Sequence, residues 1–263
     1  SIKKDLDKLY SNKLIFKDIS FNLYENDILV ILGPNGVGKT TLVKCIMNEI
    51  KGSGGEIFFD EIEINKLSYK EKSNYIGFVN SNRQNINKTV LEYLELSLCN
   101  RLAFYERPNL KHIEEIKNIL IKFNMIDYLN RNMSTLSDGE YKIINIIAVM
   151  IQNPKVIIMD EPCSSLDPNN QKKILKFIKE ISNDKIVIVI SHNPQHIYDL
   201  DAKALFLSKL DFRFYDNLND INENDYNKYF EYDVKIFIEG ERKYIYVKWD
   251  VKERINKGSK KSI

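Results

Sequence analysis

The sequence predicts an α/β fold built on a mostly parallel sheet. Three apolar runs rich in β-branched residues, at 28–32, 156–159 and 186–190, have the composition of strands that are covered on both faces. Helical patterns separate these runs, notably over 141–152 and 172–181. Alternation of strands and helices along a chain is typical of this fold class.

Further elements are predicted around this core. Alternating apolar residues over 15–24 and a hairpin pattern over 56–64 indicate an antiparallel β subdomain. Apolar residues recur at helical spacing over 113–123, within a segment that has no strand pattern. Two alternating runs at 234–238 and 243–249 predict a small C-terminal β-hairpin. The expected organisation is a core in two parts (1–88 and 136–211), a helical insertion (89–135) and a C-terminal appendage (212–263).

A glycine-rich loop lies between the first buried strand and a helical pattern over 41–50. It has the spacing G-x-x-x-x-G-K-[ST], in which backbone N–H groups and a helix N-terminus can surround a phosphate chain. Lys39 can reach the outer phosphates, and the Thr40 hydroxyl can ligate Mg²⁺. The residues expected to bind phosphates are Gly33, Pro34, Asn35, Gly36, Val37, Gly38, Lys39, Thr40 and Thr41.

Polar side chains follow the other two buried strands. Asp160 and Glu161 end one, and Ser191 and His192 follow the next. Because ligands gather at the carboxyl ends of parallel strands, we expect these groups to lie beside the phosphates. Asp160 is placed to hold Mg²⁺, Glu161 to orient or deprotonate an attacking water, and His192 to position Glu161.

A second helix start, Leu136-Ser137-Asp138-Gly139-Glu140, has two compatible interpretations. Ser137 and Glu140 have the spacing of a capping box, which satisfies unpaired N–H groups. The same helix N-terminus could instead bind a phosphate. Physical reasoning from the sequence does not choose between them.

In this order, the motifs resemble the nucleotide-binding subunit of an ABC transporter, with a P-loop NTPase core, over nearly the whole chain. Leu136–Glu140 lies where that family has its signature, 163–167 resembles its D-loop, and His192 resembles its switch histidine. The resemblance implies that Tyr10 stacks on adenine and that Ser137, Gly139, Glu140 and Asp167 contact nucleotide.

The same resemblance implies an Mg²⁺-dependent ATPase that pairs head to tail with a second ATP-binding subunit, presumed identical. Each ATP would lie between the phosphate loop of one subunit and the signature of the other. Transmembrane permease subunits, together with a substrate-binding protein in importers, are the implied partners.

The chain departs from the family pattern at several positions. Asp138 and Glu140 replace glycine and glutamine in the signature, and Ile143 stands where arginine is frequent. We expect Asp138 to point away from the nucleotide, because its charge would repel a phosphate. Ser81 occupies the position of a glutamine that contacts Mg²⁺, and Gln84 is an alternative for that contact.

Composition narrows the classes of function. A net charge of +2 gives no reason to expect nucleic acid as the partner. The three cysteines are far apart and predict free thiols in a reducing compartment. There is neither a signal-peptide pattern nor an apolar run of about 20 residues. We expect a cytoplasmic protein held on the inner face of the membrane by permease subunits.

The helical insertion and the tail are most like ATPase subunits that import iron-siderophore, haem and cobalamin complexes. Import of an iron complex is therefore the favoured transport reaction, with exporter ATPases as an alternative. A soluble ABC-type ATPase unrelated to transport and a binding-only regulatory module are the other hypotheses.

Overall fold

The computed structural model describes residues 2–10, 13–50, 55–80, 83–102, 105–209, 211–230, 233–240 and 242–248, with side chains from residue 19 onward. Within these ranges, no helix is both long enough and apolar enough to cross a bilayer.

The centre of the fold is a six-stranded sheet in the order β10-β9-β3-β8-β7-β6. Five neighbouring strands run parallel, and β10 pairs with β9 antiparallel. This confirms the predicted α/β fold with a mostly parallel sheet. The strands are β3 (Ile28–Leu32), β6 (Ile76–Val79), β7 (Val156–Asp160), β8 (Ile186–Ile190), β9 (Lys203–Ser208) and β10 (Asp211–Tyr215).

Two smaller sheets flank the central one. A four-stranded antiparallel sheet has the order β2-β1-β4-β5, and a hairpin pairs β11 with β12. Their strands are β1 (Ile2–Tyr10), β2 (Lys13–Phe21), β4 (Glu56–Phe59), β5 (Ile62–Glu63), β11 (Val234–Glu239) and β12 (Arg242–Val247). The antiparallel subdomain and the C-terminal hairpin are thus present.

Several helices begin or end at recognisable capping residues. Ser137 and Glu140 form a capping box at the start of α5, and Asn153 ends that helix in the left-handed conformation. Asp167 caps α6 and Pro168 occupies its first turn. The helices are α1 (Lys39–Ile46), α2 (Tyr69–Tyr75), α3 (Val90–Ser97), α4 (Leu110–Lys122), α5 (Asp138–Gln152), α6 (Pro168–Ile181), α7 (Gln195–Leu200) and α8 (Glu223–Phe230).

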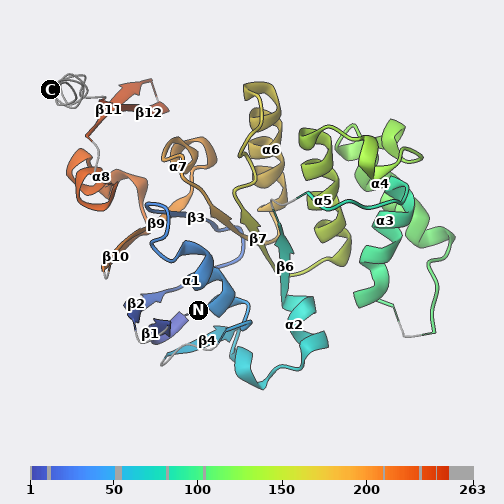
Figure 1. Ribbon diagram of the computed structural model, residues 1–263, viewed down its shortest axis with the longest axis horizontal. Helices are drawn as coiled ribbons and strands as arrows, with labels where there is room; N and C mark the ends of the chain where they lie inside the picture. Colours follow the sequence, from blue (N-terminus) through green and yellow to red (C-terminus); the bar gives the residue numbers. More distant parts are fainter. Residues whose placement is uncertain are drawn as a thin grey trace, which may run out of the picture.

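Successive residues of the buried strands pack alternately into two separate hydrophobic cores. Leu29, Ile31 and Ile158 pack with α1 and the antiparallel sheet on one face. Val30 and Ile157 pack with α5, α6, α7 and α8 on the other. Figure 1 shows this arrangement, with α1 and β1, β2 and β4 below the central sheet and α6, α7 and α8 above it. Coverage of both faces explains why these strands are apolar throughout.

Some predicted boundaries were wrong. The helix expected over 41–50 begins at Lys39 and ends at Ile46, because Asn48 adopts a left-handed conformation with φ 56°. The strand expected over 15–24 runs from Lys13 to Phe21. The sequence patterns did not predict β9, β10, α7 or α8.

Candidate nucleotide site

The glycine loop connects the carboxyl end of β3 to α1. Gly36 and Gly38 have φ values of 77° and 110°, which side-chain-bearing residues rarely adopt. A Cβ on Gly33 would lie 2.5 Å from the carbonyl oxygen of Leu207, so only glycine fits between the loop and β9. The glycines therefore allow a tight turn in which the loop backbone packs directly against β9.

The N-terminus of α1 has no side-chain cap and no acidic residue in its first turn. Its N–H groups and partial positive charge are thus available to an anion. Lys39 Nζ donates hydrogen bonds to the carbonyl oxygens of Gly33 (2.6 Å) and Pro34 (3.0 Å), within the same loop. The Thr40 side chain in the first turn is exposed.

Lys39 connects the loop electrostatically with the end of β7. Its side chain is buried, and burial lowers the pKa of the ammonium group, an effect that Glu161 and Asp160 partly oppose. Burial in turn raises the pKa of the half-buried Asp160 carboxyl, and Lys39 opposes that change. The structure therefore places the predicted lysine and both predicted carboxylates at one end of the sheet.

Glu161 and His192 meet at the carboxyl ends of β7 and β8. Oε2 of Glu161 lies 2.7 Å from Nδ1 of His192. Glu161 has a φ of 50°, and its N–H group donates to the carbonyl oxygen of Ile190 at 3.0 Å. This strained turn directs the carboxylate of Glu161 toward the neighbouring strand end, where His192 begins its loop.

A buried hydrogen bond supports the loop that carries His192. Ser191 Oγ lies 2.8 Å from Nδ1 of His196, and the Ser191 N–H group donates to the carbonyl oxygen of Ile31 at 3.1 Å. Burial lowers the pKa of His196 to about 4, against the ordinary 6.5. His196 is therefore neutral at physiological pH and serves as a structural anchor for this loop.

These residues fit a magnesium nucleotide. The uncapped start of α1 matches a polyphosphate anion. In the described part of the chain, no group of three His, Cys, Asp or Glu side chains could hold a metal. The Asp160 carboxylate near Lys39 suits Mg²⁺, which commonly takes one or two carboxylates and completes its shell with water and substrate phosphates. Asp160 and Thr40 are the residues that would hold it.

The signature segment contains the predicted capping box. Ser137 N–H donates to Glu140 Oε2 at 2.7 Å, and Glu140 N–H donates to Ser137 Oγ at 3.4 Å. The Tyr128 hydroxyl donates to Glu140 Oε1 at 2.8 Å. Burial would raise the pKa of Glu140, but these hydrogen bonds outweigh it and hold the pKa below its ordinary value. The capping box predicted from the sequence is therefore formed, and a phosphate contact at this helix start remains a prediction.

Other predicted residues have different surroundings. Both carboxylate oxygens of Asp167 cap α6, accepting from the backbone of Asn169 and Asn170 and from the Asn170 side chain. The side chain of Tyr10 and all of Ser81 lie outside the described residues. Gln84 is exposed, and its N–H group donates to the Tyr141 hydroxyl at 3.0 Å.

Sequence reasoning missed a lysine that joins the signature helix to the D-loop. Lys142 is buried on α5, where its Nζ donates to the backbone carbonyl oxygen of Ser164 (2.5 Å) and to the Ser164 hydroxyl (3.0 Å). The Ser164 hydroxyl donates to the Glu161 carbonyl oxygen at 2.9 Å. A signal existed, since Lys142 is the single charged residue in the apolar run 141–152.

The phosphate loop and the signature start helices on opposite faces of the sheet. Helix α1 packs into the core that contains the antiparallel sheet, whereas α5 packs into the other core. The two loops thus belong to different sides of one chain.

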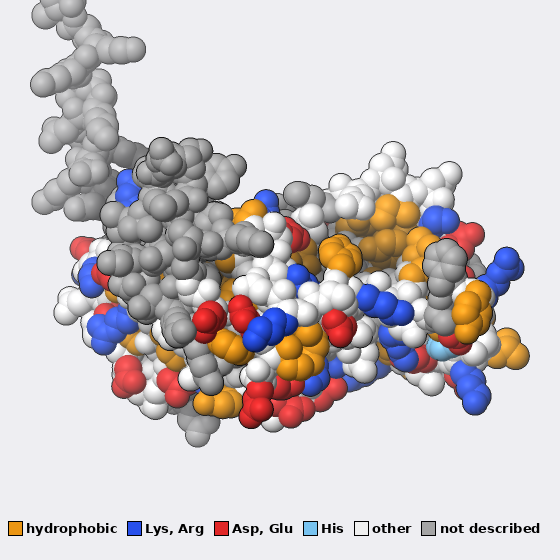
Figure 2. Space-filling model, turned by 90° about the horizontal axis from the view of Figure 1, so that it is seen from below, with side chains coloured by type: hydrophobic (Ala, Val, Ile, Leu, Met, Phe, Trp, Pro, Cys, Tyr) orange, Lys and Arg blue, Asp and Glu red, His pale blue; other side chains and the backbone are white. Residues whose placement is uncertain are grey.

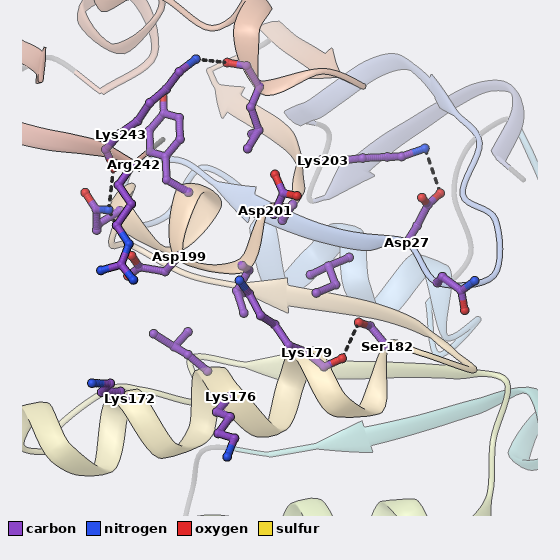
Figure 3. A pocket seen from close by; sticks show the side chains of 18 of the residues that line it. Asp27, Lys172, Lys176, Lys179, Ser182, Asp199, Asp201, Lys203, Arg242 and Lys243 are labelled. Carbon is purple, nitrogen blue, oxygen red and sulfur yellow. Dashed lines mark hydrogen bonds and ion pairs between the residues drawn. The ribbon is translucent and has the colours of Figure 1, made fainter. Parts of the chain in front are cut away.

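A separate groove of about 1200 Å³ lies between α6, α7, the amino ends of β3 and β9 and the hairpin β11–β12. Figure 3 shows its lining, with Lys172, Lys176 and Lys179 on α6 and Arg242 and Lys243 on the hairpin. Asp27 and Lys203 lie at the amino ends of β3 and β9, and neither Glu161 nor His192 lines this groove. It is not part of the candidate nucleotide site.

Comparisons with known proteins agree with this geometry. The ABC transporter family matches residues 16–164. The probable ABC transporter ATP-binding protein p29 of Mesomycoplasma hyorhinis is 30% identical over 252 residues, covering 88% of this chain and all of that protein. A Methanocaldococcus jannaschii ATP-binding protein of the same family is 32% identical over 83% of this chain and 82% of its own length.

Solved structures have the same fold. A transporter described as of the metal-chelate type, in an inward-facing conformation, superimposes with a TM-score of 0.82 at 23% identity, covering 95% of this chain and 97% of that one. An ATP-binding cassette bound to ADP and Pi gives a TM-score of 0.66 at 25% identity, covering 78% and 92% of the two chains.

One further structure comes from a multi-subunit transporter. It is the cbiO1 subunit of Clostridium perfringens, described as part of the transporter complex cbiONQ, with a TM-score of 0.68 at 25% identity over 78% of this chain and 83% of that one. The family match and the p29 alignment both exceed half of this chain. The chain therefore belongs to the ATP-binding proteins of the ABC transporter family and is an ATPase that uses ATP and Mg²⁺.

Proposed function

We propose that this ATPase drives import of an iron complex through a separate membrane permease, with Glu161 as general base and His192 as its positioning partner. The 2.7 Å contact between these two side chains carries the proposal for the catalytic residues. It lies at the carboxyl ends of β7 and β8, beside the buried Lys39.

Each residue has a distinct role in the proposed site. Glu161 accepts a proton from the attacking water, and His192 holds its carboxylate in place. Lys39 leaves its loop carbonyl oxygens to contact the outer phosphates. Thr40 and Asp160 hold Mg²⁺, which when bound neutralises the charge that develops on the phosphates.

We infer that two copies of the chain pair head to tail. The placement of α1 and α5 on opposite faces of the central sheet supports this inference, because the phosphate loop and the signature then belong to different sides of one chain. Ser137 and Gly139 of one copy would contact the nucleotide held by the other. Tyr10 would stack on adenine, and Ser81 or Gln84 would contact the metal.

The helical insertion is the proposed permease contact. Exposed hydrophobic side chains gather over this end of the molecule, as Figure 2 shows. They include Leu96, Tyr105, Leu110 and Ile121. Exposed apolar side chains of this kind suit a surface that binds the permease at the inner face of the membrane. The membrane location of the chain is thus proposed to come from the permease.

The substrate proposal rests on two supports. The helical insertion and tail resemble importers of iron-siderophore, haem and cobalamin complexes, and the metal-chelate-type transporter has the same fold over 95% of this chain. A substrate-binding protein would complete such an importer. Co-purification from mild detergent with a multi-spanning permease, followed by ATP-dependent uptake of an iron chelate into proteoliposomes, tests this assignment. If no iron chelate were taken up, the substrate assignment would be rejected.

The variant Glu161→Gln tests the catalytic assignment. The amide keeps the size of the carboxylate but cannot accept the proton. Hydrolysis of Mg-ATP should therefore fall by about 10² or more, while ATP binding persists and a nucleotide-dependent dimer accumulates. Glu114→Gln, the same change at an exposed glutamate of α4, is the matched control. Unchanged turnover in Glu161→Gln would reject Glu161 as the base.

A further inference from the structure

Arg83 contacts the signature segment at several points. Its Nη1 lies 2.8 Å from Oδ1 of Asp138, and its Nη2 donates to the carbonyl oxygens of Leu136 (2.7 Å) and Ser134 (3.0 Å). The guanidinium carbon lies 5.3 Å from the centroid of the Tyr141 ring. One side chain thus bridges the segment before α5 and the first turn of that helix.

The backbone beside Arg83 strengthens the same connection. The N–H group of Gln84 donates to the Tyr141 hydroxyl at 3.0 Å. Residues 83 and 84 follow the position of Ser81, and they reach a segment that lies 51–57 residues further along the chain. The loop after β6 is therefore attached to the start of α5 through two neighbouring residues.

The charge of Asp138 makes this attachment important. Its side chain is 64% exposed in the first turn of α5, directly beside Ser137 and Gly139. A free carboxylate there would repel an incoming phosphate. The guanidinium of Arg83 holds this carboxylate and supplies a compensating positive charge.

The two carbonyl contacts have a different effect. Leu136 and Ser134 lie just before the N-cap Ser137, where the backbone must turn into the helix. A planar guanidinium that binds both oxygens and the carboxylate restricts this turn, because its donors have a fixed geometry. Lysine could supply the charge but not the same set of directed hydrogen bonds.

We propose that Arg83 is a positioning residue for the signature, which it neutralises at Asp138 and orients through the carbonyl oxygens of Ser134 and Leu136. It prepares this surface to accept the phosphate that is bound by the other subunit. The inference rests on the proposed head-to-tail dimer. Arg83 contacts no reacting atom, so its removal should weaken docking of the signature more than chemistry.

ATP titration of dimer formation in the Glu161→Gln background tests this role by light scattering. Arg83→Ala should raise the ATP concentration at half-dimerisation by about tenfold, through lost charge-assisted hydrogen bonds. Arg83→Lys should recover part of that loss. Adding Asp138→Gly to Arg83→Ala should recover part too, because the unpaired charge is removed. Arg107→Ala, at an exposed arginine of the helical insertion, is the matched control.

Steady-state kinetics with the natural Glu161 give the second measurement. Arg83→Ala should raise KM for ATP several-fold more than it lowers kcat. A several-fold fall in kcat with an unchanged KM for ATP would overturn the inference. The inference would also be overturned if Arg83→Ala reached half-dimerisation at the same ATP concentration as the Arg107→Ala control.

Hydrogen exchange on the nucleotide-free protein separates this inference from the proposed function. Arg83→Ala should cause loss of amide protection in 133–141 relative to Arg107→Ala, and unchanged protection would overturn the positioning role. Failure of Glu161→Gln to dimerise with ATP would instead reject the head-to-tail proposal, while the exchange result would still decide whether Arg83 orients this segment.

Discussion

Oε2 of Glu161 and Nδ1 of His192 lie 2.7 Å apart although 31 residues separate them in the chain. Strand pairing produces this proximity, because β7 and β8 run parallel with Asp160 opposite Ile190. The residues that follow this pair leave the sheet at the same edge. A carboxylate and an imidazole in contact at a strand edge can act together on a water molecule.

Replacing His192 should slow hydrolysis without preventing ATP binding. In His192→Ala the Glu161 carboxylate loses its hydrogen-bond partner and its fixed orientation, so kcat should fall by up to about a hundredfold. The Kd for ATP, measured by calorimetry, should change by less than a factor of about three, because the loop and Lys39 remain. His112→Ala, at a half-buried histidine of α4 outside the candidate site, is the control. Normal kcat in His192→Ala would contradict the positioning role.

The core strands and the phosphate loop were predictable because local sequence determines them. β3 and β8 were predicted at their observed bounds, since strands covered on both faces must be apolar throughout. The glycine loop was recognisable because its spacing reflects backbone requirements at Gly33, Gly36 and Gly38. Such features need no knowledge of distant residues.

Elements that depend on tertiary contacts were not predictable in this way. β9 contains Ala204, Leu205 and Leu207, residues that favour helices, and it is a strand because it pairs with β3 and β10. α8 is polar by composition, and its Tyr226 and Phe230 rings pack against Phe206 of β9. Neither partner can be inferred from local patterns.

The candidate site shows the same division. The sequence predicted Asp160, Glu161 and His192 at the carboxyl ends of strands, because these residues follow apolar runs that have the composition of strands. The contact between Arg83 and Asp138 spans 55 residues and has no local signature in the sequence. Long-range ion pairs form wherever the fold brings charges together, so only the structure could reveal this one.

Alanine at two glycines of the phosphate loop should have unequal effects on folding. A Cβ at Gly33 would lie 2.5 Å from a backbone oxygen, so Gly33→Ala should lower the free energy of unfolding by about 2 kcal/mol or more. Gly36 has open space around it, and Gly36→Ala should cost about 1 kcal/mol through its φ of 77°. Urea denaturation measures both changes. Greater loss in Gly36→Ala would contradict this ranking.

The effect of Gly139→Ala should depend on Asn170. A Cβ at Gly139 would lie 2.9 Å from Cγ of Asn170, whose amide donates to Asp167, so the substitution should destabilise the protein by about 1–2 kcal/mol. In an Asn170→Ala background the obstacle is gone, and the higher helix propensity of alanine should make the same substitution neutral or stabilising. Urea unfolding of all four proteins gives this cycle. Equal losses in both backgrounds would exclude the contact as the cause.

Stability should fall below pH 6.5 because of His196. Burial lowers the pKa of this histidine to about 4; the nearby His192 acts in the same direction, and Asp199 acts in the opposite one. The unfolded chain therefore binds a proton between pH 6.5 and about 4 that the folded chain does not bind, so stability rises with pH in that window. The two pKa values differ by an amount equivalent to about 3 kcal/mol of unfolding free energy, which is present above pH 6.5 and lost as the pH approaches 4. His196→Gln lacks this proton and should show a correspondingly shallower decline in urea-unfolding free energy between pH 7.5 and 4.5. Because carboxylates titrate in both proteins, the difference between their profiles isolates the histidine, and parallel profiles would show that burial of His196 does not control the pH dependence.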